Sequence, residues 1–139
     1  MKKTISIYCD GGARGNPGPG AIAFVVLEDG KTIYKFSKKI GHTTNNVAEY
    51  QAVISALEWL KNSSIINQSS INFYLDSQLV VNQLNGLFKI KDGKLRVLIV
   101  KVRGLEQQIG GKIFYNLISR QQNKIADALV NKALIVFSC

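Results

Sequence analysis

Apolar runs separated by turn residues along the first forty residues predict three strands. The segment from Thr4 to Asp10 is rich in β-branched and aromatic residues and ends at a glycine-rich stretch, which is typical of a strand that runs into a turn. A second apolar run extends from Ala21 to Glu28, and Asp29-Gly30 after it indicates a hairpin. A third strand is then expected from Lys31 to Ile40, so the chain should begin with a three-stranded meander.

The hydrophobic period changes to that of a helix near Asn46. Apolar residues recur at helical spacing, at Tyr50, Ile54, Leu57 and Leu60. This spacing predicts a long helix from Asn46 to about Lys61. Asn45 or Asn46 is the expected N-cap, and Glu49 follows Asn46 by three residues, as in a capping box.

Strands and helices alternate in the rest of the chain, after a polar linker from Asn62 to Ser70. We expect a strand over Ile71 to Asp76, a short helix over Ser77 to Leu84, a second helical stretch over Asp92 to Gln108, a strand over Lys112 to Ile118, and a final helix capped by Asn123. Strand–helix–strand crossovers imply parallel pairing, so an antiparallel half should join a parallel half in one mixed α/β sheet. We find no repeat or domain linker, so residues 1–139 are expected to form a single domain.

Two of these predicted strands end alike, in Ile7-Tyr8-Cys9-Asp10 and in Phe73-Tyr74-Leu75-Asp76. Each Asp follows a Tyr by two residues and therefore shares its face of the sheet. If the strands are parallel neighbours in register, the two Asp residues lie about 5 Å apart. Carboxylates that close repel each other unless a cation lies between them, and carboxylate oxygens suit hard divalent ions such as Mg²⁺.

Two further acidic residues are expected at the same edge of the sheet. Glu49 and Asp127 fall in the first turns of helices that follow strands, and both helices should begin where strands one and four end. Taken singly, each of the four acids has a simpler role as a cap or turn residue. Four acids at one edge of a chain with only nine nevertheless favour a cation site.

Charge and cysteine content narrow the class of partner and compartment. The chain has 18 Lys and Arg against 9 Asp and Glu, a formal net charge of +9, which favours a polyanionic partner such as nucleic acid or an anionic membrane surface. Cys9 and Cys139 are expected to be free thiols, and no His or Cys cluster has zinc-ligand spacing. The apolar stretch after the first lysines is too short for a signal peptide, and the longest apolar run, from Ala21 to Leu27, is too short to span a bilayer. We therefore expect a cytoplasmic protein.

Four motifs together resemble type 1 ribonuclease H (ribonuclease HI). They are YCDGGARGNPGPG, TTNNVAEYQA from Thr43 to Ala52, LDSQLVV from Leu75 to Val81, and NKIADALVNKA from Asn123 to Ala133. The resemblance runs from about Ile5 to Leu134 and implies the ribonuclease H-like fold, a mixed five-stranded sheet in the order 3-2-1-4-5 with strand 2 antiparallel and helices on both faces. It implies an endonuclease that hydrolyses the RNA strand of RNA–DNA hybrids, leaving 5′-phosphate and 3′-hydroxyl ends.

The same resemblance implies the metal site. The metal-binding and catalytic carboxylates of the family fall on Asp10, Glu49, Asp76 and Asp127. They are expected to hold two Mg²⁺ ions, for which Mn²⁺ can substitute. One ion would activate a water and the other would stabilise the leaving 3′ oxygen. Asp10 would contact both ions, and Asp127 would be the most mobile ligand.

Substrate contacts are implied in the same way. A hybrid carries 2′-hydroxyls on one strand only, so contacts to them distinguish RNA from DNA. The glycine-rich backbone can approach the minor groove closely because glycine has no side chain. By resemblance, Thr44 would bind a phosphate of the DNA strand. Asn16 and Asn46 would make polar contacts to the hybrid, and their alternative role is that of turn or cap residues. The expected substrate-binding residues are Gly11, Gly12, Ala13, Arg14, Gly15, Asn16, Thr44, Asn45, Asn46 and Gln78.

The chain departs from the family pattern in three ways. Many relatives have a mobile histidine before the last catalytic Asp, and Arg120 is the candidate substitute here. His42 lies where an arginine is common, and it could face a phosphate or solvent. The tryptophan-rich basic protrusion of longer relatives is replaced by a shorter basic segment, and we expect no separate hybrid-binding domain. We therefore expect a compact, monomeric form that binds the hybrid weakly and with strong salt dependence. The segment contains Lys89, Lys91, Lys94, Arg96, Lys101 and Arg103.

Other readings of the glycine-rich stretch fail or remain as alternatives. A phosphate-binding P-loop is excluded because GxxxxGK(S/T) is missing and a strand follows the glycines. The spacing from Gly18 to Ala23 resembles that of a dinucleotide-binding motif, but such a site is also excluded because no helix follows. Two alternatives stay open: another nuclease of the ribonuclease H superfamily, and a non-catalytic module that binds RNA–DNA hybrids or double-stranded RNA.

Overall fold

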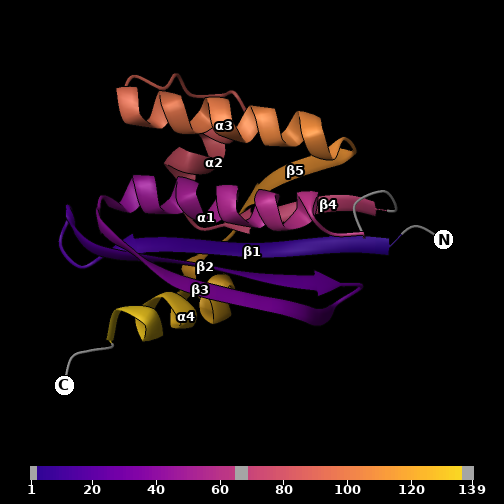
Figure 1. Ribbon diagram of the computed structural model, residues 1–139, viewed down its shortest axis with the longest axis horizontal. Coiled ribbons are helices and arrows are strands. Elements are labelled where there is room, and N and C mark those ends of the chain that lie inside the picture. The colour runs from indigo at the N-terminus through magenta and orange to yellow at the C-terminus, as the bar shows by residue number, and fades with distance from the viewer. Residues whose placement is uncertain (1–2, 65–68, 136–139) are drawn as a thin grey trace.

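The computed structural model describes residues 3–64 and 69–135, and Figure 1 shows the order of their helices and strands. These residues form five strands, four α-helices and one 3₁₀ turn. The elements are β1 (Lys3–Ala13), β2 (Gly18–Glu28), β3 (Lys31–Thr43), α1 (Asn45–Lys61), β4 (Ser69–Leu75), α2 (Gln78–Leu84), α3 (Gly93–Ile109), β5 (Lys112–Leu117), η2 (Arg120–Asn123) and α4 (Lys124–Ile135).

The strands form one mixed sheet in the order β3-β2-β1-β4-β5. Strand β2 pairs antiparallel with both β1 and β3, whereas β4 pairs parallel with β1 and β5. The predicted sheet, with its order and its antiparallel second strand, is confirmed. The two long crossovers, through α1 and through α2 and α3, make the parallel half possible.

Helices cover both faces of the sheet, as expected. Helix α1 lies against β1 on one face, α2 and α3 lie beyond α1, and α4 packs under β2 and β3 on the other face (Figure 1). The main core lies between α1 and the sheet, where alternate residues of β1 such as Ile5 and Ile7 are fully buried against Leu57 and Leu60. A smaller cluster of Ala21, Ala23 and Val130 joins α4 to β2.

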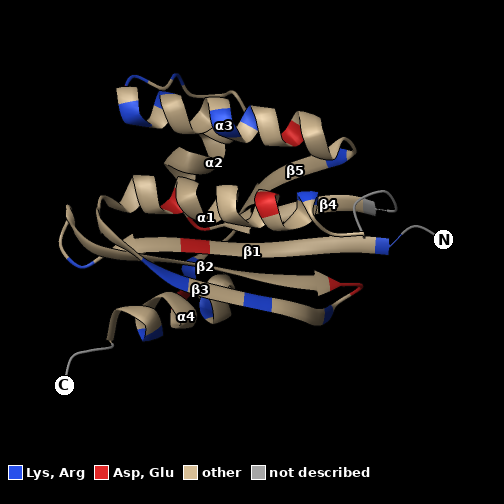
Figure 2. Cartoon of the chain, viewed as in Figure 1, with Lys and Arg blue, Asp and Glu red and all other residues tan. Residues whose placement is uncertain are grey.

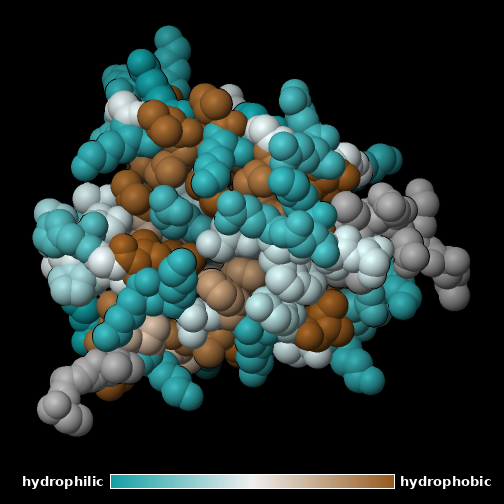
Figure 3. All heavy atoms as spheres, in the orientation of Figure 1, coloured by the Kyte–Doolittle hydropathy of each residue, from teal (hydrophilic) through white to brown (hydrophobic). Residues whose placement is uncertain are grey.

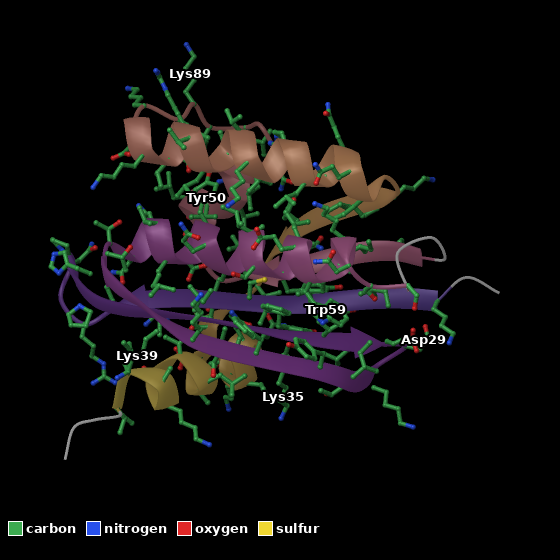
Figure 4. All side chains as sticks on the ribbon, viewed as in Figure 1. Asp29, Lys35, Lys39, Tyr50, Trp59 and Lys89 are labelled. Atoms are coloured by element: carbon green, nitrogen blue, oxygen red, sulfur yellow. The ribbon has the colours of Figure 1, made fainter. Side chains whose placement is uncertain are left out.

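Aromatic side chains of α1 anchor this helix on both of its sides (Figure 4). Trp59 stacks on Tyr34 of β3 with ring centroids 5.0 Å apart. Tyr50 points the other way, and its hydroxyl donates a hydrogen bond to Gln83 Oε1 of α2 over 2.8 Å in the buried core. Helix α1 is therefore held between the sheet and α2, which fixes the position of the residues it carries to the sheet edge.

Most of the glycine-rich stretch is strand, which corrects the predicted end of strand one at Asp10. Pairing with β2 continues from Asp10 opposite Ala23 to Ala13 opposite Gly20. Strand β2 begins at Gly18, and β3 likewise runs on to Thr43. The turn residues in the sequence conceal this extension, because only the antiparallel partner stabilises the extended backbone of glycines.

The starts of two helices also differ from the predicted caps. Thr44 is the N-cap of α1 and accepts a hydrogen bond from the Val47 amide, so the proposed capping box of Glu49 is wrong and Glu49 lies in the second turn. Asn123 does not cap α4 but ends the 3₁₀ turn η2, which Ser119 caps. The Thr44 hydroxyl caps α1 and the Ser119 hydroxyl caps η2, which leaves the side chains of Asn45 and Asn123 for other contacts.

Hydrophilic side chains cover much of the face in Figure 3, and exposed apolar residues such as Val97 and Val100 belong to α3. Among residues 3–64 and 69–135, no helix combines the length and apolar character that crossing a membrane requires. Cys9 is a buried free thiol. Cys139 and residues 65–68 of the predicted linker lie outside the described residues.

Candidate active site

Three carboxylates meet at the edge of the sheet. Asp10 in β1, Glu49 in α1 and Asp76 directly after β4 each offer an oxygen, and the three oxygens lie within 4.8 Å of one another. Asp10 and Glu49 are buried and Asp76 is half-buried. The structure thus brings together three of the four acids on which the sequence analysis placed a cation site.

The strand register explains why the two Asp residues are neighbours. Strands β1 and β4 pair in parallel up to Tyr8 opposite Tyr74, and the same register carried two residues further sets Asp10 opposite Asp76. The rings of the two tyrosines stack with centroids 4.8 Å apart, on the face that the Asp residues share. The two strands are therefore parallel neighbours in register, which is the condition under which the sequence predicted that the two Asp residues are close.

Gly11 brings Glu49 to this edge. Its amide donates a hydrogen bond to Glu49 Oε1 over 3.1 Å. A Cβ atom at Gly11 would lie 2.3 Å from the backbone carbon and oxygen of Ala48, so only glycine lets β1 and α1 approach this closely. Glu49 Oε2 is buried and has no hydrogen-bond partner among the described residues.

The charges in the cluster are costly without a cation. Burial, together with the nearby charges of Asp76 and Asp127, raises the pKa of Asp10 from 3.8 to about 7. Burial also raises the pKa of Glu49 well above its ordinary value, with the charge of Asp10 as a second cause. The apo cluster therefore favours protonated carboxyl groups near neutral pH, and a bound cation would reverse that preference.

Asp127 lies close to this group without completing it. It occupies the first turn of α4, as predicted, and its charge acts on Asp10. Its Oδ2 accepts a hydrogen bond from Asn131 over 3.3 Å, and it is not among the three residues whose oxygens lie within 4.8 Å.

This donor set fits a divalent cation. Carboxylate oxygens are the ligands that Mg²⁺ and Ca²⁺ prefer, and three of them converge here. The buried Glu49 Oε2 without a partner and the raised pKa of Asp10 both indicate a site that is satisfied by a positive charge.

Asn123 makes a contact to the site that the sequence analysis did not anticipate. Its Nδ2 donates to the Cys9 carbonyl over 2.8 Å and to Asp76 Oδ2 over 3.0 Å. The sequence signal was ambiguous, because an asparagine just before a helix is typical of an N-cap. Only the tertiary structure shows that its partners are 114 and 47 residues away along the chain.

The expected substrate residues gather around the start of α1. Asn16 Oδ1 accepts from the Asn45 amide, and Asn45 Oδ1 accepts from the Ala13 amide, each over 2.9 Å. These bonds tie the turn after β1 to the helix. Asn16, Thr44 and Asn46 line a cavity of about 520 Å³ with Lys94 at the start of α3.

The remaining residues of the glycine-rich stretch divide into two groups. Gly11 is buried, and its amide donates to Glu49 within the protein. Gly12 and Ala13 end β1, and Arg14 and Gly15 follow in the turn, where Gly15 has a φ of 84°. Outside this stretch, Gln78 is exposed at the first position of α2, two residues after Asp76.

Two residues that depart from the family pattern lie at different places. Arg120 is exposed at the first position of η2, three residues before Asn123 on the same turn. His42 pairs with Pro19 across the β2–β3 ladder and lines a separate cavity of about 490 Å³ with Lys38 and Gln51.

Three side chains of the basic segment around α3 contact other groups of the protein. The Arg103 guanidinium donates to Glu106 and to the Leu84 carbonyl, the latter over 2.6 Å. The Lys101 ammonium lies 3.8 Å from Glu58. Arg96 Nε donates to the Ile90 carbonyl. Lys89, Lys91 and Lys94 are exposed before and at the start of α3, and Figure 4 shows Lys89 extending away from the helix.

The fold and the carboxylate cluster define an α/β protein of the ribonuclease H-like class. Residues 2–135 match the profile of the family described as RNase H. The chain belongs to the RNase H family, which confirms the resemblance drawn from the four motifs.

Known relatives and solved structures agree with this assignment. The bifunctional protein Rv2228c of Mycobacterium tuberculosis is 38% identical over 132 residues, which are 94% of this chain and 35% of the relative. Ribonuclease HI of Halobacterium salinarum is 38% identical over 133 residues, which are 94% of this chain and 64% of the relative. The chain therefore spans from about a third to just under two thirds of the length of these relatives.

LC11-RNase H1, isolated from compost by a metagenomic approach, has a similar structure over nearly its whole length. The TM-score is 0.89 at 40% identity, with 96% of each chain covered. A second structure of LC11-RNase H1, in complex with an RNA/DNA hybrid, gives a TM-score of 0.86 at 39% identity and covers 94% of this chain and 96% of that one.

Proposed function

We propose that this protein is an endonuclease that hydrolyses the RNA strand of RNA–DNA hybrids with the help of two divalent metal ions. The observation that carries the proposal is the cluster of Asp10, Glu49 and Asp76, with carboxylate oxygens within 4.8 Å, in a chain of the RNase H family. A similar protein, LC11-RNase H1, has been solved with an RNA/DNA hybrid, which supports the choice of substrate.

Asp10, Glu49, Asp76 and Asp127 would hold the ions, which we propose to be Mg²⁺, with Mn²⁺ as a substitute. Bound ions of this kind activate a water and stabilise the charge that develops on the leaving oxygen. Asp10 is the central ligand, since its carboxylate interacts with all three other acids. Glu49 would contribute Oε2, which has no hydrogen-bond partner within residues 3–64 and 69–135, while the Gly11 amide holds Oε1.

The residues around the start of α1 would recognise the hybrid. Since Asn16 and Asn45 use their amide oxygens within the protein, each would offer its NH₂ group to sugar or base acceptors of the minor groove. Thr44 would bind a DNA-strand phosphate in the cavity that it shares with Lys94. Further contacts would come from the backbone of residues 12–15 and from Asn46 and Gln78.

We assign Arg120 an auxiliary role at the same edge. It lies on the turn that also carries Asn123, and Asn123 contacts Asp76. A guanidinium at this place would bind a phosphate oxygen of substrate or product. This would aid product release, and Arg120→Ala should therefore lower kcat more than it weakens hybrid binding.

A cleavage assay tests the proposal. An RNA–DNA hybrid labelled separately on each strand is incubated with Mg²⁺ or Mn²⁺ and wild-type protein, Asp10→Asn or Glu49→Gln. We expect cleavage of the RNA strand by the wild type and a loss of at least a hundredfold in both variants. Glu58→Gln is the matched control, because it removes an exposed carboxylate from the same helix and should leave cleavage unchanged.

Other outcomes would point to the alternatives. Binding of the hybrid without cleavage under either metal would identify a non-catalytic binding module. Equal cleavage of the DNA strand would indicate a different nuclease of the ribonuclease H superfamily. Retention of full cleavage in Asp10→Asn would overturn the assignment of the site.

A further inference from the structure

Asn123 is among the most deeply buried polar residues of the protein, with 1% of its surface exposed. Its side-chain amide reaches two segments that are remote in sequence. One partner is the Cys9 carbonyl, next to Asp10, at 2.8 Å, and the other is Asp76 Oδ2 at 3.0 Å. The residue therefore contacts β1 next to Asp10 and the residue that directly follows β4.

Asn123 lies where the ladder between these strands stops. The last parallel pair of β1 and β4 is Tyr8 with Tyr74. The Asn123 amide bridges the two chain segments just beyond this pair, from the carbonyl of Cys9 to the carboxylate of Asp76. It also immediately precedes Lys124, the first residue of α4, so the same contact fixes the start of the helix that carries Asp127.

The hydrogen bonds fix the orientation of the amide. Both partners are oxygen acceptors, so the NH₂ group must face them. The other end, Asn123 Oδ1, is buried without a hydrogen-bond partner among the described residues. A buried acceptor without a partner is costly, so the stabilising contribution of the Asn123 side chain comes from the two hydrogen bonds that its NH₂ group donates. The bond to Asp76 Oδ2 leaves the second oxygen of that carboxylate for a cation.

We propose that Asn123 is a positioning residue that holds the Asp76 carboxylate and the start of α4 in the arrangement needed for divalent cation binding. The inference rests on the proposed function. Partners of metal ligands orient the ligand and limit its motion, and their loss typically costs tenfold to a hundredfold in metal affinity or activity. Asn123 contacts a proposed ligand and no reacting atom, so its effect acts through Asp76 and Asp127.

Asn116 offers a matched control. Its Nδ2 also donates two hydrogen bonds, to Asn72 Oδ1 over 3.3 Å and to the Phe73 carbonyl over 3.1 Å. It thereby ties β5 to β4 as Asn123 ties two strand ends, but no carboxylate is involved. Asn116→Ala therefore reproduces the structural loss without touching the site.

The test measures Mn²⁺ binding by titration calorimetry, hybrid cleavage at saturating metal, and the Tm of the metal-free protein. We compare wild type, Asn123→Ala, Asn123→Ser and Asn116→Ala. In Asn123→Ala we expect Mn²⁺ binding about tenfold weaker, kcat at least tenfold lower, and KM for the hybrid within about twofold of wild type. Asn123→Ser keeps a donor and should recover part of both losses. Asn116→Ala should lower Tm while its metal Kd and kcat stay within about twofold.

The outcomes separate this inference from the proposed function. Metal affinity and kcat of Asn123→Ala that match those of Asn116→Ala would overturn it. If wild type binds Mn²⁺ but cleaves no hybrid, the proposed function fails, while weaker Mn²⁺ binding in Asn123→Ala still supports the positioning role. If Asn123→Ala does not fold, Asn123→Ser decides. Mn²⁺ binding weaker than in wild type then supports the positioning role of Asn123, and Mn²⁺ affinity equal to wild type overturns it.

Discussion

Gly11 and Gly12 are adjacent residues of β1 that differ in the space around them. A Cβ at Gly11 would lie 2.3 Å from Ala48 backbone atoms, whereas the nearest atoms to a Cβ at Gly12 are 3.9 Å away. We expect Gly11→Ala to lower the free energy of unfolding by about 1–3 kcal/mol, because β1 and α1 must separate. It should also weaken divalent cation binding, because Glu49 moves with α1. Urea unfolding and Mn²⁺ titration measure the two effects.

Gly12→Ala is the control for stability and metal binding. Because its Cβ would make only ordinary van der Waals contacts, at 3.9 Å, it should change the free energy of unfolding by less than about 1 kcal/mol and leave metal affinity intact. Equal destabilisation by both substitutions would contradict the view that the contact with Ala48 is what requires glycine at position 11.

Asp10 should make the stability of the metal-free protein depend on pH. Its pKa rises from 3.8 to about 7 on folding, mainly through burial, so the folded state holds the proton more tightly. The resulting stabilisation is complete below about pH 4 and is lost as the pH rises towards 7. Asp10→Asn should therefore stabilise the metal-free fold by roughly 2–3 kcal/mol more at pH 8 than at pH 5, at about 1.4 kcal/mol per pKa unit. Urea unfolding with EDTA at both values measures this difference.

The exposed Glu58 supplies the comparison for this measurement. Glu58→Gln should shift the free energy of unfolding by a similar small amount at pH 5 and at pH 8. If Asp10→Asn gains no more at pH 8 than at pH 5, then repulsion and burial at the cluster do not affect the stability of the fold.

Single residues also show what the sequence could reveal about the site. The spacing of Asp10 and Asp76 from their tyrosines predicted that each Asp shares a face of the sheet with its Tyr, because side-chain direction alternates along any strand. The condition that the two strands are parallel neighbours in register is met. The partners of Glu49 and Asn123 could not be predicted in the same way. Both residues fit local capping patterns, and the hydrogen bonds that they make instead depend on strands folded against them from elsewhere in the chain.

At the scale of elements, a partly buried hydrogen-bond network joins α2, α3 and β5. Arg103 of α3 donates to the Leu84 carbonyl at the end of α2 and to Glu106, and the Tyr115 hydroxyl of β5 donates to the same carboxylate over 2.5 Å. Burial and the Glu106 carboxylate raise the pKa of Tyr115 far above its ordinary value, so the hydroxyl stays a donor. The Arg103 guanidinium therefore links α3 to α2 within the protein, although the sequence analysis placed Arg103 in the basic segment expected to bind the hybrid.

Arg103→Ala tests this role. We expect it to lower the free energy of unfolding by about 1–2 kcal/mol, because the Leu84 carbonyl loses its donor and Glu106 keeps only the Tyr115 hydroxyl as a partner. The salt dependence of hybrid binding should stay the same. Thermal unfolding and binding titrations at several salt concentrations check both statements. A reduced salt dependence of hybrid binding without loss of stability would show that Arg103 contacts the hybrid instead.

Element boundaries followed the sequence closely where apolar periodicity was strong. The predicted second helical stretch, Asp92 to Gln108, differs from α3 by one residue at each end, since Asp92 is its N-cap. Strand β1 ran three residues further than predicted. Glycine carries no local preference for a strand, so only its pairing with Gly20, Ala21 and Ile22 of β2 keeps residues 11–13 extended.

On the scale of the whole molecule, positive charge is spread unevenly around an acidic site. Figure 2 shows Lys and Arg residues near the start of α3 and along β3, with acidic residues in β1 and α1 between them. The net charge of +9 supports attraction of a polyanion. With Arg103 paired internally and Lys101 close to Glu58, the lysines before and at the start of α3 remain for phosphate contacts.

Hybrid binding should therefore be weak and should decrease steeply with salt. Each phosphate neutralised by a Lys or Arg releases counterions, so the logarithm of the binding constant falls linearly with that of the salt concentration, by a slope of about one per contact. We expect Lys89→Ala and Lys94→Ala each to reduce this slope by about one, whereas Arg103→Ala should not. Fluorescence anisotropy with labelled hybrid from 50 to 200 mM salt, in Ca²⁺ to prevent cleavage, measures the slopes. Affinity independent of salt would mean that recognition rests on neutral contacts of the glycine and asparagine residues alone, and that the basic segment has no part in it.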